Sequence, residues 1–135
     1  MAGRMEPVMA EDDWATVKAA LVAVFAEEGR RLQKYDESIV FDANGRLMRY
    51  GDIVSWLTVS RFGAMDPLIE TTATVAGEPG SYRMSADIGT FDGEVFAEIE
   101  GDEALTVDDM VNRLRRFLVD NADLLERMAA SAEPT

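Results

Sequence analysis

The stretch SYRMSADIGTFDGEVFAEIEGDE, residues 81–103, decides the fold because polar and apolar residues alternate on both sides of a turn signal. Asp92-Gly93 is a dipeptide typical of two-residue β-hairpin turns. Such a turn aligns three pairs of residues on one face of the hairpin: Thr90 with Val95, Ile88 with Ala97, and Ala86 with Ile99. The register of the turn and the alternation of polarity agree, so the stretch predicts two antiparallel strands.

Three segments before this hairpin also have the composition of strands. The segment SIVFDANGRLMRY, residues 38–50, places two short apolar runs around Asn44-Gly45, which predicts a second hairpin turn. Residues 53–62 and 68–76 are rich in β-branched or aromatic side chains, and turn residues follow each of them. Together the segments predict an antiparallel β-meander of four to five strands.

A helix is predicted on each side of the strands. Over residues 11–35, apolar residues recur at steps of three and four, which gives one apolar stripe, although Gly29 could end this helix early. The same spacing over residues 106–130 predicts a C-terminal amphipathic helix, with Thr106 as N-cap and Asp109 completing a capping box. The order predicts a two-layer α+β fold in one domain, residues 1–135, with an ordered core over about 10–129.

The composition excludes several classes of function. The 26 acidic residues outnumber the 13 basic residues and give a net charge of −13, which argues against binding to nucleic acids or anionic membranes. Because cysteine and histidine are absent, disulfides, thiol nucleophiles, Cys/His zinc sites and imidazole-based triads are excluded. Because these catalytic groups are absent, we expect a non-enzymatic protein without a cofactor. No apolar run has the length of a signal peptide or membrane span, so we expect a cytoplasmic protein.

Eight carboxylates lie between residues 91 and 110, and the predicted hairpin separates them. Glu94, Glu98 and Glu100 occupy alternate positions on the face opposite the core, while the others fall in connections or in the first turn of a helix. This distribution indicates a solvated surface with helix caps. The spacing of a calcium loop is absent, so no metal site is predicted. A loose surface metal site and a carboxylate pair acting as acid and base are the alternatives.

Two features of the polar face of the hairpin do not fit a plain solvated surface. Asp87 is predicted opposite Glu98, where like charges cost stability unless Arg83 on the same face offsets them. Phe96 is predicted on this face opposite Gly89, among carboxylates. An aromatic ring in such a place indicates an interface with a partner. The alternatives are that the register is off by one, or that the N-terminal segment packs over the ring.

The strand at 53–62 raises a similar question about the second face of the sheet. If Ile53, Leu57 and Val59 face the core, the residues that face the other way include Val54, Trp56 and Phe62. A sheet that is apolar on both faces predicts helices on opposite faces or a dimer seam. The alternative is that the first helix covers this side.

Residues 86–125 contain a strand, an acidic-glycine turn, a second strand and a helix with Phe117 near its middle. This order resembles the C-terminal part of bacterial type III secretion chaperones and of the related YbjN-type domains. The resemblance extends to the leading helix and the twisted antiparallel sheet. It implies a protein-binding chaperone, often a homodimer, without catalytic residues. Those chaperones have a middle helix between strands, whereas residues 63–80 here predict a turn, a strand and a turn.

These observations predict a non-enzymatic protein-binding domain that is chaperone-like or regulatory. The protein partner is expected to be basic or partly unfolded. The residues predicted to supply apolar contacts to it are Phe96, Trp56 and Phe62. The residues predicted to steer it are Glu94, Glu98 and Glu100. One alternative is an immunity-type inhibitor or nucleic-acid mimic that binds a basic protein. Another is a small enzyme that depends on carboxylates or a metal.

Overall fold

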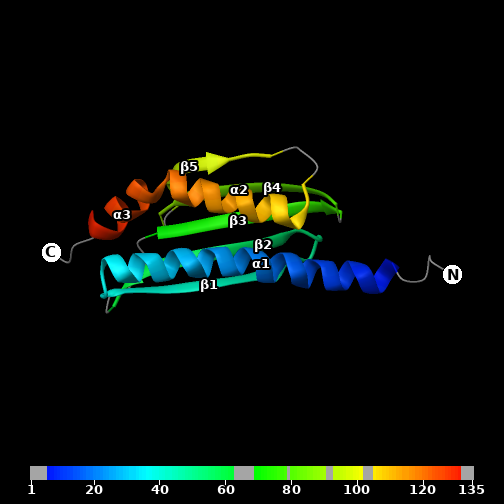
Figure 1. Ribbon diagram of the computed structural model, residues 1–135, viewed down its shortest axis with the longest axis horizontal. Coiled ribbons are helices and arrows are strands. Elements are labelled where there is room, and N and C mark those ends of the chain that lie inside the picture. Colours follow the sequence, from blue (N-terminus) through cyan, green and yellow to red (C-terminus); the bar gives the residue numbers. More distant parts are fainter. Residues whose placement is uncertain (1–5, 63–68, 79, 91–92, 102–104, 132–135) are drawn as a thin grey trace.

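The computed structural model of the chain describes residues 6–62, 69–78, 80–90, 93–101 and 105–131 (Figure 1). A long helix comes first, and strands and two further helices follow it. The elements are α1 (Glu6–Tyr35), β1 (Ile39–Leu47), β2 (Ile53–Arg61), β3 (Ile69–Glu78), β4 (Ser81–Gly89), β5 (Val95–Ile99), α2 (Val107–Asp120) and α3 (Ala122–Ser131). The predicted α+β class and the order of helix, strands and helix are confirmed.

The strands form one five-stranded antiparallel sheet in the order β1-β2-β3-β4-β5, so each strand pairs with its neighbour in sequence. Leu57 of β2 lies between Ala43 of β1 and Thr71 of β3. Buried and less buried positions alternate along β2, β3 and most of β4. Because successive side chains of a strand point to opposite faces, only one face of the sheet belongs to the core.

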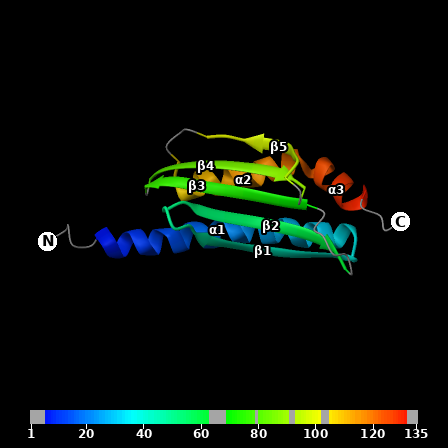
Figure 2. The same cartoon turned by 180° about the vertical axis from the view of Figure 1, so that it is seen from behind.

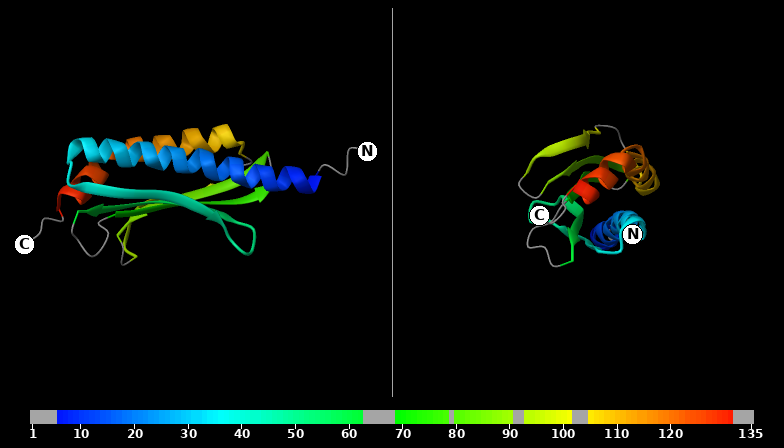
Figure 3. Two further views of the ribbon diagram at one scale, coloured as in Figure 1. Left: turned by 90° about the horizontal axis from the view of Figure 1, so that it is seen from below. Right: turned by 90° about the vertical axis from the view of Figure 1, so that its left-hand side faces the viewer.

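The helices of the described chain all lie on this core face. α1 packs on β1 and β2, and α2 and α3 lie beside it, against β4 and β3 respectively. The end-on view in Figure 3 shows the helices together on one side of the sheet. Two predicted alternatives are therefore wrong: the helices do not lie on opposite faces, and α1 does not cover the far side of β2. The view from behind shows that far face of the sheet in front of the helices (Figure 2).

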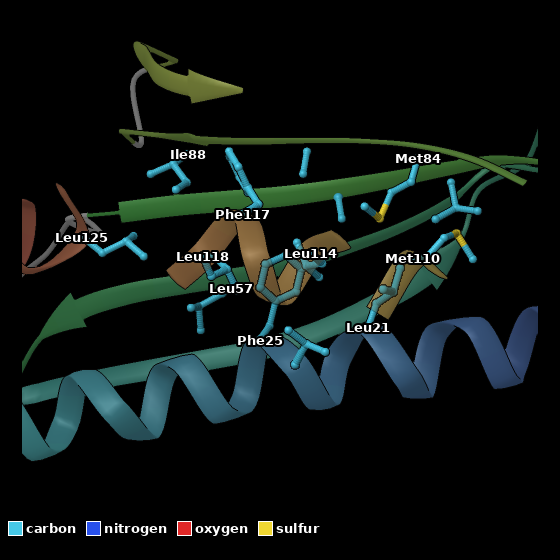
Figure 4. Packing of buried hydrophobic residues seen from close by; sticks show 14 of the residues in the cluster. Leu21, Phe25, Leu57, Met84, Ile88, Met110, Leu114, Phe117, Leu118 and Leu125 are labelled. Atoms are coloured by element: carbon cyan, nitrogen blue, oxygen red, sulfur yellow. The ribbon is translucent and has the colours of Figure 1, made fainter. Parts of the chain in front are cut away.

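The core lies between the sheet and the helices and follows the apolar stripes of the sequence. Leu21 and Phe25 of α1 and Leu114 and Leu118 of α2 are buried and point into this layer (Figure 4). The sheet residues that they approach include Leu57, Met84 and Ile88 (Figure 4). Full burial of each large apolar side chain stabilises the fold by about 1.5–3 kcal/mol. The contacts in this layer therefore stabilise the packing of the helices on the sheet.

Two glycines allow α1 to lie close to the sheet. Gly29, six residues before the end of α1, faces the ring of Phe41 on β1, and a Cβ atom at Gly29 would overlap that ring. Gly45 of β1 is buried, and a Cβ atom there would lie 2.9 Å from Ser55 Oγ and 3.3 Å from Lys18 Cγ. The early helix end considered at Gly29 is wrong, because α1 continues to Tyr35. Glycine at position 29 allows α1 to pack closely on β1 and does not end the helix.

The hairpin predicted at Asn44-Gly45 is also wrong, because both residues belong to β1. The chain turns later, where the Met48 amide donates to the Asp52 carbonyl oxygen at 2.7 Å. Gly51 in this turn has a φ of 104°, a conformation that favours glycine. The turn signal at Asn44-Gly45 is therefore overridden by the pairing of β1 with β2 along its whole length.

The predicted C-terminal helix is divided into two helices. It begins with the predicted capping box: the Asp109 amide donates to Thr106 Oγ1 at 3.1 Å, and the Thr106 amide donates to Asp109 Oδ2 at 3.0 Å. These hydrogen bonds to Thr106 lower the pKa of Asp109. The division lies at Asn121, whose side-chain amide donates to the Phe117 carbonyl oxygen at 2.8 Å. A side chain that competes for a helix carbonyl in this way is typical of helix ends.

Two arginines attach α3 to the rest of the molecule. Arg61, at the end of β2, donates to the Ala129 carbonyl oxygen at 2.8 Å and to Asp36 Oδ2 at 3.1 Å. Arg31 of α1 forms an ion pair with Glu126 of α3 at 2.6 Å. The two contacts fix the position of α3 over the end of the sheet.

Replacing Gly29 with alanine tests the packing of α1 on β1. In a solvated helix, this change would stabilise by about 1 kcal/mol because alanine has the higher helix propensity. Here we expect it to lower the free energy of unfolding by about 1–3 kcal/mol, the usual cost of overpacking, measured by urea unfolding and circular dichroism. In a Phe41→Ala background, the same change should be neutral or stabilising. A Gly29→Ala protein that is more stable than the parent would contradict the close approach.

Candidate protein-binding surface

The face of the sheet away from the helices, here called the open face, consists of the positions that alternate with the core residues. None of its large side chains is fully buried, and most are polar. Its members include Val40, Asp42, Asn44 and Arg46 of β1; Val54, Trp56, Thr58 and Ser60 of β2; Glu70, Thr72 and Thr74 of β3; Arg83, Ser85 and Asp87 of β4; and Glu98 of β5. These members present hydroxyl groups, carboxylates, two arginines, two valines and one tryptophan.

One row of the open face runs across all five strands. The paired residues in this row are Asn44, Trp56, Thr72, Asp87 and Glu98. The indole N–H of Trp56 donates to Asp42 Oδ2 at 3.4 Å, and the ring is half-buried among its neighbours. The row begins with an amide and an indole and ends with two carboxylates, so its negative charge is concentrated on β4 and β5.

Asp87 and Glu98 lie directly opposite each other, and this predicted pair is confirmed. Burial, the charge of Glu98 and the charge of Glu70 raise the pKa of Asp87. Arg83 lies across from Ala76, four residues along β4, and makes no ion pair within the described parts of the chain. The acidic charge at this place is therefore not neutralised by the arginine that could have offset it.

The hairpin of β4 and β5 has the predicted register near its base and a different one near its turn. The predicted pairs found at the base are Ala86 with Ile99 and Ile88 with Ala97. The register then shifts, so that Val95 pairs with Gly89, and the predicted pair of Val95 with Thr90 is wrong. A Cβ atom at Gly89 would overlap the carbonyl oxygen of Glu94, so this β-bulge requires glycine. Asp92, in the predicted turn, lies outside the described residues.

Phe96 is exposed at the edge of the sheet. It was predicted opposite Gly89 and is instead the additional residue of the bulge, so the alternative of a register error holds at this position. Its exposed fraction is 49%, and that of Val95 is 51%. α1 does not cover the ring, because the described part of α1 lies on the other side of the sheet. Two neighbouring apolar side chains therefore face solvent at the edge strand.

The residues predicted to bind a partner do not all lie together. Those on or next to β5 form one exposed cluster with Val95, here called the β5 patch: Glu94, Val95, Phe96, Glu98 and Glu100. Trp56 shares a row with Glu98 but lies three strands away, about 14 Å at the usual strand spacing. Phe62 is 83% exposed and follows the last residue of β2, six residues and about 20 Å beyond Trp56, so it is outside the patch.

Val95 is the member of the β5 patch that the sequence did not indicate. A regular hairpin register places it on the core face, whereas the bulge leaves it half-exposed beside Phe96. The only signal was the glycine at position 89, whose role depends on the approach of the Glu94 carbonyl oxygen. A contact across the hairpin of this kind is not visible in local sequence.

The described residues show neither a metal-binding cluster nor a membrane-spanning helix. Within the ranges that the structure describes, no group of three carboxylates is arranged to hold a metal ion. In the same ranges, no helix combines the length and the apolar character needed to span a membrane. The exposed apolar and acidic residues of the β5 patch are the most distinctive feature of this side of the molecule.

Comparison with known proteins does not assign a family. The chain matches no protein-family model, and no curated protein or solved structure is significantly similar to it. The resemblance to type III secretion chaperones therefore stays a prediction. Between β2 and β4, the described residues form the strand β3 where those chaperones have a helix.

Replacing Asp87 with asparagine tests the electrostatic cost of the acidic row. The pKa of Asp87 is higher in the folded than in the unfolded protein, so its contribution to stability is present below the unfolded pKa and is lost as pH rises through the folded pKa. We therefore expect Asp87→Asn to stabilise the protein near pH 7 by about 0.2–1 kcal/mol, the usual size of a cross-strand charge effect. Near pH 3 the difference should disappear in thermal unfolding.

The matched control for this experiment is Glu37→Gln, which removes the same charge from an exposed position after α1. If both variants stabilise equally, the effect comes from the net charge of −13 and not from the contact between Asp87 and its neighbours.

Proposed function

We propose that this chain is a non-enzymatic protein-binding domain, chaperone-like or regulatory and cytoplasmic, that docks its partner on the β5 patch and the adjoining open face. The observation that supports the proposal is the exposed ring of Phe96 among the carboxylates of the edge strand β5, next to a sheet face that the described helices leave uncovered. Aromatic side chains supply much of the binding free energy at interfaces, and surrounding charges set specificity and association rate.

The charge of the β5 patch favours a basic partner. Glu94, Glu98 and Glu100 are exposed, and none of them forms an ion pair with another described residue. The net charge of −13 adds a long-range field of the same sign. A partner with lysines or arginines around an apolar anchor site would complement both the carboxylates and the Phe96 ring. Salt should screen this attraction.

A second candidate function is an inhibitor that covers the basic surface of a folded protein. Asp42, Glu70 and Asp87 extend the acidic charge across the open face, beyond the β5 patch. Such an extended surface suits a folded basic partner, whereas a chaperone would hold an extended or partly unfolded segment. The two functions use the same face and differ in the state of the bound partner.

Affinity capture with mass spectrometry should identify the partner, and variants then test the surface. We expect Phe96→Asp to weaken binding of the recovered partner at least tenfold, about 1.4 kcal/mol, because the ring is lost and a like charge is added. The matched control is Phe62→Asp, which makes the same change at an exposed ring outside the patch and should leave affinity unchanged.

Salt dependence gives the second readout of the same experiment. Raising the salt concentration from about 50 to about 500 mM should weaken binding of the parent protein because it screens the carboxylates. The proposal fails if Phe96→Asp, with its fold intact by circular dichroism, binds the partner as the parent does. It also fails if the affinity is independent of salt.

A further inference from the structure

The sheet has two edge strands, β1 and β5, and only one of them is blocked against further pairing. Short strands and β-bulges are common devices that keep an edge from pairing with another strand. β5 has five residues and a bulge in its pairing with β4. β1 has nine residues, pairs regularly with β2 and contains no proline. It forms the lower margin of the sheet in Figure 1, so β1 is the edge that is open to another strand.

Odd-numbered residues of β1 direct their backbone groups away from β2. The Met48 amide donates to the Asp52 carbonyl oxygen, which makes the even-numbered positions the hydrogen-bonded partners of β2. In agreement, the amide of Gly45 donates to the side chain of the adjoining Asn44 at 2.8 Å and not to β2. The residues whose amide and carbonyl groups face the open edge are Phe41, Ala43, Gly45 and Leu47.

The side chains of β1 form a symmetric pattern about Asn44. Two antiparallel copies of β1 centred on Asn44 would place Asp42 of each copy opposite Arg46 of the other. The remaining pairs would be Phe41 with Leu47, Val40 with Met48, and Ala43 with Gly45. Each pair thus joins opposite charges, two apolar side chains or two small residues. A pairing centred on Asp42 or on Arg46 would instead bring like charges together, which destabilises a sheet.

This register also agrees with the direction of the backbone groups and with the exposed side chains. Odd-numbered residues would meet odd-numbered residues, so the groups that face the open edge would bond to each other. Asp42 and Arg46 would form non-hydrogen-bonded pairs, in which side chains lie closest. The exposed fractions of Val40 and Leu47 are 40% and 41%, and the pairing would cover both side chains.

Helix α1 leaves room for a second copy at this edge. α1 packs on both β1 and β2, so two α1 axes would lie about 10 Å apart across the paired edges, near the usual spacing of packed helices. Val22 and Ala26 share the side of α1 on which Gly29 approaches β1. This side turns away from α2, because Glu27 forms an ion pair with Arg115 of α2 at 2.9 Å. Small side chains there allow the two helices to lie side by side.

We propose that two copies of this chain dimerise edge to edge through β1, with the two-fold axis at Asn44. The dimer would contain one continuous antiparallel sheet of ten strands, five from each copy. A two-fold interface requires a self-complementary surface, which the pattern about Asn44 supplies. The two β5 patches would lie at opposite ends of this sheet, so dimerisation does not depend on the function proposed for the patch.

Cysteine crosslinking tests the position of the axis. The chain has no cysteine, so Asn44→Cys introduces a single thiol that would face the thiol of the second copy. The Cα atoms of a non-hydrogen-bonded antiparallel pair lie about 4.5 Å apart, within the range that a disulfide spans. Mild oxidation should therefore give a covalent dimer on a non-reducing gel. The matched control Glu98→Cys, at an exposed position of the other edge strand, should remain monomeric on that gel.

Charge exchange tests the register by analytical ultracentrifugation of the full-length chain, whose dimer has a mass of about twice 14.9 kDa. Asp42→Arg and Arg46→Asp should each weaken dimerisation at least tenfold, because like charges would then face each other. An equimolar mixture of the two variants should form a heterodimer, since every charge again meets its opposite. Glu98→Arg makes the same charge change as Asp42→Arg on the other edge strand and should dimerise as the parent does.

Four results would overturn the proposal, with the folded state of each variant checked by circular dichroism. The first is a parent chain that stays monomeric at about 1 mM. The second is a dimer that Asp42→Arg and Arg46→Asp leave as tight as that of the parent. The third is a mixture of these two variants without a heterodimer. The fourth is crosslinking of Glu98→Cys as readily as of Asn44→Cys, since that result places the contact elsewhere or makes it random.

Discussion

The structure depends on one layer of apolar contacts between a single face of the sheet and the helices that cover it. Leu21 and Phe25 of α1 and Leu114 and Leu118 of α2 all point into this layer. Because the described helices are all engaged there, none is left for the other face of the sheet. The alternation of side chains along each strand then assigns every residue either to the core or to a solvent-facing surface.

This one-sided packing explains why the open face differs in composition from the core face. Two of its carboxylates, Asp87 on β4 and Glu98 on β5, lie opposite each other, and neither forms an ion pair with a described arginine. Like charges on adjacent strands destabilise a sheet, and perturbed carboxylates of this kind are common at functional sites. In the proposed function, a basic partner bound over Phe96 would supply positive charge that offsets Asp87 and Glu98.

Much of the fold could be predicted from the sequence because hydrophobic periods of two and of three to four are local properties. The β4–β5 register near its base and the Thr106 capping box are of this kind. The errors arose where a residue serves a distant contact. Gly29 and Gly45 permit α1 to approach the sheet, and Gly89 permits the bulge that exposes Val95. The placement of the helices on one face likewise depends on tertiary packing and not on any single segment.

The most direct test of the proposed docking surface uses the absence of cysteine from the chain. Ser85→Cys places a thiol on the exposed part of the open face, and Ala23→Cys places one on the outer side of α1. The measurement is the rate of thiol alkylation with and without the captured partner. Slower alkylation of Ser85→Cys alone is the predicted result. Protection of Ala23→Cys, with Ser85→Cys reacting as in the free protein, would contradict the account.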